Sequence, residues 1–353
     1  MEGNVELFGR SLTDRELRRR VGRLDQAAGI EPLVLDDGPA RGVRALRVRT
    51  GSGLSFTVLP DRGMDLDATE FRGVPLAWLS HTGVVAPSFR ESEGEGWLRS
   101  FHGGLLVTCG LQNVGPPGEV NGEVLGLHGR VSNTPASRVS HEARWDEGGC
   151  VLEARGEIRE ARVFGANLVL RRTISARVGE SRIRVEDAVE NEGFEPQPLM
   201  LLYHMNLGWP LLDETARLVG PGKPPEPRDD DAQSGLRTWN RFAAPTPGFR
   251  ERVFYHRPEA KEDGWTEARL ENPALGDGLT LSIRFRPEEL PEFVQWTMTG
   301  EGTYVLGLES ATCRVGGREA EEEAGRVIYL QPGESRRYRL EISVSAANEK
   351  RAG

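Results

Sequence analysis

The sequence predicts an all-β protein built as a large antiparallel β-sandwich, with one short helix near the N-terminus. Short segments alternate between apolar and polar residues with a period of two, which is typical of strands that bury one face. The 353 residues include 43 glycines and 22 prolines, spread between these segments as turn residues. Helical spacing is scarce, so the pattern favours a sandwich over an alternating βαβ fold.

The strand period is clearest in four segments. Each puts apolar side chains on one face and polar side chains on the other. The segments are 54–58, 182–189, 279–285 and 337–344. Helical spacing occurs only from Thr13 to Ala28, with Thr13 as N-cap and Gly29 as the stop.

We expect a single domain over residues 1–353. It divides into an N-terminal extension with the helix (1–40), the β-sandwich (41–345) and a frayed tail (346–353). Segments 220–235 and 258–272 are rich in proline or charge and predict exposed connections; the alternative is a rim over a binding cleft.

Charge and cysteine usage narrow the class of protein. The 54 acidic residues outnumber the 45 basic ones, and a net charge of −9 disfavours nucleic acid as a partner. No apolar segment approaches the roughly 20 residues of a membrane span, so no membrane partner is expected. Three dispersed cysteines and a polar N-terminus favour reduced thiols in a cytoplasmic protein. The oligomeric state stays open.

His204 is the strongest histidine candidate for a site. It lies in an apolar strand, and Asn206, two residues on, shares its face. An imidazole and an amide buried together are costly without partners. A ligand or another polar side chain would supply them.

Glu309 is the strongest carboxylate candidate. It ends a strand that starts at Gly302, and Gly307 lies on the same face, where it leaves space for a substrate. The alternative is a solvated acid at a strand end.

Two further histidines lie beside glycines, which let a ligand or another backbone come close. They are His102, in the segment 101–104, and His128, which is followed by Gly129 and Arg130. A purely structural histidine is the alternative for each.

Other polar residues have the chemistry of a sugar site. Trp296 offers a flat face for the C–H side of a sugar, and Gln295 offers a donor and an acceptor for hydroxyls. Arg62 and Asp65 lie in a glycine turn and either contact hydroxyls or pair within the turn. Arg62 and Arg130 leave a phosphorylated or acidic sugar open.

Five segments together resemble the aldose 1-epimerase (galactose mutarotase-like) family, and in particular an uncharacterised aldose 1-epimerase-like branch. The resemblance covers residues 40 to 345. The segments are PDRGMDLD (60–67), FHGGLLVTCGLQNVGPP (101–117), GLHGRVSNTPA (126–136), LLYHMNLGWPLLDE (201–214) and FVQWTMTGEGTYVLGLES (293–310).

The resemblance implies a β-supersandwich that binds a sugar and interconverts its anomers. It gives Glu309 the role of base and His204 that of acid, with His102 or His128 as a second sugar-binding histidine. The acid role requires His204 to hold a proton near neutral pH, which a nearby carboxylate would favour. One departure is that His-Pro-Tyr-Phe-Asn-Leu of familiar galactose mutarotases is replaced by residues 204–209, which puts galactose as substrate in doubt.

The implied chemistry needs no cofactor and no metal, only an acid and a base. Two other readings remain. One is a sugar-binding protein without catalysis, and the other is a different sugar enzyme on the same scaffold, such as a lyase, a keto-sugar isomerase or a hydrolase. A hydrolase would need a second carboxylate near the bond that is cleaved, and Asp65, Asp213 and Glu309 are the candidates for the pair.

Overall fold

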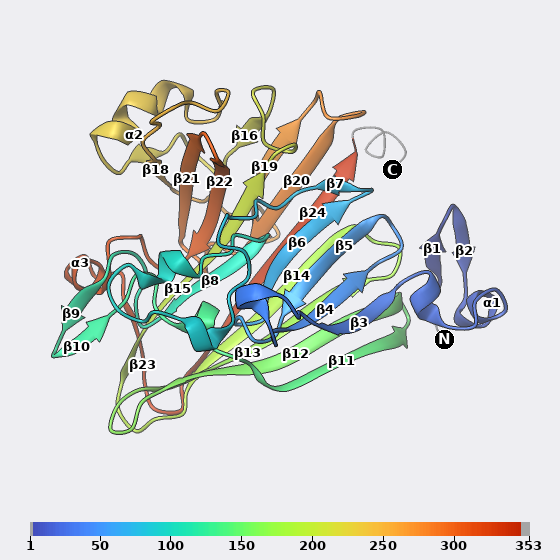
Figure 1. Cartoon of the computed structure of the whole chain (residues 1–353), viewed down its shortest axis with the longest axis horizontal. Helices are drawn as coiled ribbons and strands as arrows, with labels where there is room; N and C mark the ends of the chain where they lie inside the picture. Colours follow the sequence, from blue (N-terminus) through green and yellow to red (C-terminus); the bar gives the residue numbers. More distant parts are fainter. Residues whose placement is uncertain (1–2, 347–353) are drawn as a thin grey trace.

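The computed structural model describes residues 3–346, and strands dominate them. They form two large antiparallel sheets and two small hairpins (Figure 1). The predicted all-β antiparallel architecture is confirmed. None of the helices in this described part is long and apolar enough to cross a membrane.

The first large sheet has eight strands, and each pairs antiparallel with its neighbours. In spatial order they are β11 (Ser137–Asp146), β12 (Gly149–Ala161), β13 (Asn167–Arg177), β14 (Arg182–Asn191), β24 (Ser335–Ala346), β20 (Leu279–Phe285), β19 (Thr266–Asn272) and β16 (Arg217–Val219).

The second large sheet has twelve strands and carries the candidate site. Its main path runs through β17 (Glu226–Pro227), β18 (Arg252–His256), β21 (Glu292–Gly300), β22 (Thr303–Ala311), β15 (Gln197–Gly208), β8 (Leu106–Leu111), β6 (Asp65–Phe71), β5 (Leu54–Leu59), β4 (Arg44–Arg49) and β3 (Gly29–Val34). Off this path, β23 (Ile328–Leu330) pairs with β15, and β7 (Val74–Pro75) pairs with β6. The hairpins are β1 (Val5–Leu7) with β2 (Arg10–Leu12), and β9 (Gly118–Val120) with β10 (Glu123–Leu125).

The main core draws its side chains from both large sheets. On β20 the apolar side chains of 279, 281, 283 and 285 are buried, as the period of two predicts. The same holds for 338, 340, 342 and 344 on β24. Phe285 and Phe293 stack at 5.4 Å between ring centroids and join the two sheets.

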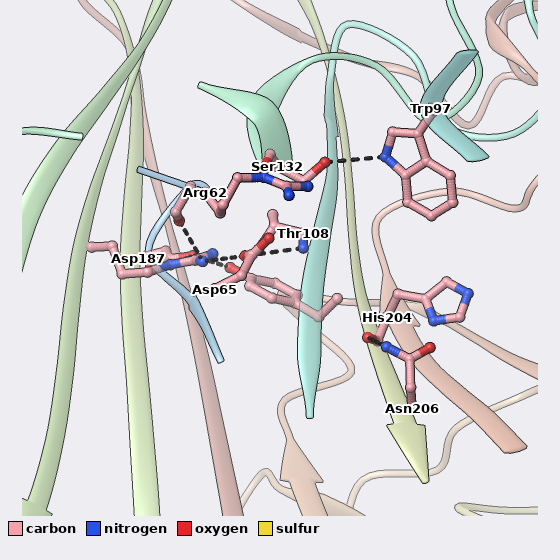
Figure 2. Close-up of polar contacts among 11 residues, drawn as sticks. Arg62, Asp65, Trp97, Thr108, Ser132, Asp187, His204 and Asn206 are labelled. Carbon is pink, nitrogen blue, oxygen red and sulfur yellow. Dashed lines mark hydrogen bonds and ion pairs between the residues drawn. The ribbon is translucent and has the colours of Figure 1, made fainter. Parts of the chain in front are cut away.

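A buried ion-pair cluster also joins the sheets (Figure 2). Arg172 of β13 donates to Asp187 of β14 at 2.7 Å and to Asp65 of β6 at 3.0 Å, and all three side chains are fully buried. Tyr203 of β15 donates its hydroxyl to Asp187 at 2.6 Å. Thr108 of β8 donates to Asp65 at 2.6 Å. This cluster anchors β15 and β8 on the face of the sheet opposite the candidate site.

The helices are short: α1 (Asp14–Arg18), α2 (Asp230–Gly235) and α3 (Arg318–Glu323). Thr13 caps α1 in a capping box with Glu16, as its sequence position suggested. The expected helix to Ala28 is wrong in length, because the helix ends before Gly22, a residue of low helix propensity.

Parts of the expected connections are ordered elements. Segment 220–235 contains β17 and α2, and Asp229 caps α2 by accepting from the Ala232 amide at 2.9 Å. Segment 258–272 ends in β19. Of the tail expected to fray, Ala346 ends β24, and the rest lies outside the described residues.

Candidate functional site

Pairing between β15 and β22 places His204 directly opposite Glu309. His204 Nε2 and Glu309 Oε1 are 3.2 Å apart, and both side chains are buried. Gly307, on the same face of β22, makes this approach possible. A Cβ there would lie 2.8 Å from Glu309 Oε1 and 3.1 Å from His204 Cε1. Two residues about a hundred positions apart in sequence are therefore brought into hydrogen-bonding distance.

The pair opens into a cavity of about 580 Å³, a size that suits a small ligand. Its walls come from strands of the larger sheet and from loops beside them. The lining residues are Trp78, Ser80, His81, Thr82, Glu95, Trp97, Leu98, Phe101, Gly115, Pro116, Leu127, His128, His204, Arg228, Glu251, Val253, Val294, Trp296, Thr303, Glu309 and Val315.

Aromatic rings form much of the wall around His204. Phe101 and Trp296 contact the imidazole edge-on, at 5.4 and 5.5 Å between centroids. Trp97 stacks on Phe101 at 4.3 Å, and Trp78 meets Trp296 at 6.5 Å. Flat apolar faces beside a few polar groups are suited to the C–H faces of sugars.

His128, and not His102, is the second histidine of the cavity. Its backbone has a positive φ of 54°, and its Nδ1 accepts from the Gly115 amide at 3.3 Å. Because Nδ1 is the acceptor, the neutral ring carries its proton on Nε2, where it can donate. The ring lies 6.3 Å from that of His204.

Charged groups at the cavity wall are mainly acidic. Arg228 donates to Glu251 at 3.0 Å and to Asp229 at 2.8 Å, so its charge is already matched. Glu251 also accepts from Trp296 Nε1 at 2.8 Å. Glu95 adds a further exposed carboxylate.

Burial controls the protonation of the pair. It lowers the pKa of His204 to about 3, helped by the nearby His128. Burial, and then the charge of Glu251, raises the pKa of Glu309 well above its ordinary value. Both shifts favour a ligand-free pair in which the imidazole is neutral and the carboxyl group carries the proton. The expectation that a carboxylate keeps His204 protonated is wrong, because desolvation of the imidazolium outweighs that attraction.

Gln295 lies away from the cavity, contrary to expectation. Neighbouring residues of a strand point to opposite faces, so Trp296 and Gln295 cannot both line it. The Gln295 amide donates to Trp239 O and Thr297, and its oxygen bonds His256 Nε2 at 3.0 Å. The hydrogen-bonding groups of Gln295 are therefore used within the protein interior, away from the cavity.

Arg62 and Asp65 are also structural in position. Arg62 is 1% exposed and donates to three backbone carbonyls, those of Val85, Ser100 and Ser132. Asp65 belongs to the Arg172 cluster, and neither residue lines the cavity. The alternative was that Arg62 pairs with an aspartate of the turn. All its hydrogen bonds go to backbone carbonyls, although the charges of Arg62 and Asp65 act on each other's pKa.

The remaining candidates lie outside the cavity lining too. Asn206 is fully buried and donates to the carbonyls of Gly104 and His204. His102 is 1% exposed, and burial lowers its pKa well below the ordinary value. Arg130 is exposed. The expected direct contacts of these three with a ligand are not supported.

Sequence reasoning missed several lining residues. Trp78, Arg228 and Glu251 come from loops and strand ends, and Trp97 comes from a short 3-10 helix. Only their position in the fold brings them together. Arg228 lies in segment 220–235, for which a cleft rim was the alternative reading. Among residues 3–346, no group of three or more His, Cys, Asp or Glu side chains has the arrangement of a metal site.

The architecture first defines a class of protein. Two large antiparallel sheets around one core place it among the galactose mutarotase-like β-sandwiches. A galactose mutarotase-like protein from Clostridium acetobutylicum matches at a TM-score of 0.63 and 13% identity, over 91% of this chain and 99% of that one. The galactose 1-epimerase of Lactobacillus acidophilus matches at 0.58 and 12%, over 90% and 99%. At these identities the likeness concerns the fold alone.

Within this class, the chain belongs to the family described as a domain of unknown function (DUF4432), whose model matches residues 40–344. A candidate aldose 1-epimerase from Klebsiella pneumoniae is 33% identical, with a TM-score of 0.86 over 92% of this chain and 85% of that one. The resemblance to aldose 1-epimerases is thereby confirmed. No curated protein sequence matches the chain.

Proposed function

We propose that the protein is an isomerase that interconverts the anomers of a sugar, with Glu309 and His204 as its acid–base pair. The observation that carries the proposal is the 3.2 Å approach of His204 Nε2 to Glu309 Oε1 at the wall of an aromatic cavity. A carboxyl group and an imidazole that hold one proton between them can deliver it and recover it.

The reaction needs two proton transfers at neighbouring atoms. One group removes the proton from the anomeric hydroxyl while the other protonates the ring oxygen. The bond from the anomeric carbon to the ring oxygen breaks, and an aldehyde forms. After rotation about the adjacent C–C bond, the same transfers run in reverse and close the ring as either anomer. The pair ends with the one proton it began with, so no cofactor is consumed.

Two features of the cavity support a sugar as ligand. Trp78, Trp97 and Trp296 offer flat apolar faces, and His128 offers an Nε2–H donor for a hydroxyl. Burial lowers the pKa of His128 to about 4, so this ring donates as a neutral group at neutral pH. His128 is the substrate-binding histidine of this proposal.

The test begins with a thermal-shift and saturation-transfer screen of neutral, acidic and phosphorylated sugars. Anomer exchange of the sugars that bind is then followed by NMR. Glu309→Gln keeps size and hydrogen-bonding atoms but removes the titrating group. It should leave binding within a few-fold and slow exchange by ~10²-fold or more. His204→Asn should do the same, and the double variant should cost less than the sum.

Glu292→Gln is the matched control. Glu292 begins β21 and pairs with Arg314 away from the cavity lining, so exchange should not change. Rapid exchange by Glu309→Gln of a sugar that binds would contradict the acid–base proposal. Binding without exchange by the wild-type protein would leave a sugar-binding protein.

One observation favours a glycoside hydrolase as the second candidate. Glu251 lines the same cavity as Glu309, and its charge raises the pKa of Glu309. A protonated and an ionised carboxyl group are what glycoside hydrolysis requires. Asp65 and Asp213, the other partners considered from sequence, do not line the cavity. Release of free sugar from alkyl or aryl glycosides, abolished by Glu251→Gln, would favour hydrolysis over anomer exchange.

A further inference from the structure

The amide of Asn206 has a fixed orientation directly beside His204. Both residues lie on β15, two positions apart, and so share one face of the strand. The Asn206 nitrogen donates to Gly104 O at 3.1 Å and to His204 O at 3.0 Å. Because both protons of the amide nitrogen are used in these bonds, the position of the side-chain oxygen, Oδ1, is fixed as well.

Two buried polar atoms are left facing each other. Among the described residues, Asn206 Oδ1 and His204 Nδ1 are both buried and without a hydrogen-bond partner. Figure 2 shows the amide oxygen directed towards the imidazole. Buried polar groups are almost always paired, and an amide oxygen can only accept. A hydrogen bond between these two atoms therefore requires the proton on His204 Nδ1.

We infer that Asn206 is a positioning residue, which holds His204 as the tautomer protonated on Nδ1 and turns the lone pair of Nε2 towards Glu309. The interaction with Asn206 raises the pKa of His204 against the larger effect of burial, as expected when the imidazole donates to the amide oxygen. The neutral ring then faces a protonated Glu309 across 3.2 Å. Each donor in this series then has an acceptor: the Asn206 amide donates to Gly104 O, His204 Nδ1 donates to Asn206 Oδ1, and Glu309 donates to His204 Nε2.

This tautomer assigns the direction of proton transfer, a step that rests on the proposed function. In ring opening, Glu309 gives its proton to the ring oxygen, and His204 Nε2 takes the proton of the anomeric hydroxyl. In ring closure, each proton returns. The roles are the reverse of those that the family resemblance implies for Glu309 and His204. Protonated on both nitrogens after the transfer, His204 can still donate from Nδ1 to Asn206 Oδ1.

The tautomer can be read without any sugar, from ¹⁵N NMR of protein labelled on its histidines. The signals of His204 are those absent from His204→Asn. We expect a protonated Nδ1 and an unprotonated Nε2 at neutral pH. Asn206→Ala should shift the ring towards the Nε2–H tautomer or a mixture, and Asn206→Asp, which keeps an acceptor, should restore Nδ1–H.

The kinetic readout separates positioning from simple support of the fold. Asn206→Ala should lower kcat for anomer exchange by about tenfold with KM nearly unchanged, and Asn206→Asp should recover part of the loss. A wild-type spectrum with the proton on Nε2 would overturn the inference even if Asn206→Ala did not fold. Absence of exchange with every sugar, alongside the expected spectrum, would sink the proposed function and leave the tautomer standing.

Discussion

The two faces of β15 carry polar groups in opposite states. Behind the strand, Tyr203 donates to Asp187, and Arg172 is shared between Asp187 and Asp65. The Arg172 guanidinium and the Tyr203 hydroxyl have acceptors there, whereas Asp65 Oδ2 and the hydroxyl of Tyr338, which pairs with Asp187 between β24 and β14, have no partner. On the opposite face, one residue further along, His204 lies 3.2 Å from Glu309 at the cavity wall. Arg228, the cation that acts on this carboxyl group, is itself paired with Glu251 and Asp229.

The difference teaches how to separate structural from functional polar groups in a buried strand. Charges that are fully paired hold sheets together and are expensive to break. Groups that stay neutral by shifting their pKa, and that border a cavity, are available to a ligand. Both kinds came from similar sequence signals, since Asp65 and Glu309 are each an acid next to a strand.

Arg172→Met should cause the largest loss of stability. It leaves Asp65 and Asp187 buried without their cation, which costs about 3–5 kcal/mol in the free energy of unfolding. Urea unfolding measures this loss. Arg171→Met is the control, because Arg171 points to the other face and pairs with Glu190 and Glu192 near solvent. It should cost about 1 kcal/mol or less. Equal losses of stability for the two variants would contradict the claim that the buried ion-pair cluster contributes more than the ion pairs near solvent.

Acidification should destabilise the protein through its buried neutral histidines. Burial lowers the pKa of His256 to about 4 from 6.5. Between these values the unfolded chain binds a proton that the folded protein does not, so stability falls as pH falls from about 6.5 to about 4. One such group contributes about 3 kcal/mol by pH 4. His256→Gln, which can still donate to Gln295, should flatten that part of the curve. An unchanged pH dependence of the unfolding free energy would contradict the assigned burial.

Gly307→Ala tests the cavity side of the comparison. Its Cβ would enter the space beside Glu309 Oε1 and His204 Cε1 at 2.8 and 3.1 Å. We expect anomer exchange to fall by about tenfold while unfolding changes by about 1 kcal/mol. Gly118→Ala on β9 is the control, because a Cβ there meets no atom within 4 Å. A full-rate Gly307→Ala would mean that the pair does not need its present spacing.

Much of this arrangement could be predicted from the sequence, and its limits have physical causes. Strand alternation and the family resemblance predicted the sandwich, and the candidates His204 and Glu309 are brought together by the β15–β22 register. The prediction that Gln295 contacts the ligand was wrong, although the period of two already places Gln295 and Trp296 on opposite faces of the strand. Arg62 could not be separated from a ligand-binding arginine, because its three carbonyl partners come from distant loops. Lining residues such as Trp97 have no local signal at all.

The smallest effect concerns ligand charge. Arg228 is already matched by Glu251 and Asp229, and Glu95 adds an exposed carboxylate, so the lining supplies no free cation for an anionic group. A hexose 6-phosphate should therefore bind more weakly than the matching neutral hexose that the screen identifies.

Glu95→Gln should improve binding of the phosphate two- to threefold, since an exposed carboxylate acts through water and is worth about 0.5 kcal/mol. The gain should shrink as salt is raised, because screening weakens interactions between exposed charges. Titration calorimetry at two ionic strengths measures both effects, with Glu292→Gln as the control away from the cavity. Tighter binding of the phosphate by the wild-type protein would show that a cationic group reaches the ligand, and would make Arg228 the first residue to test.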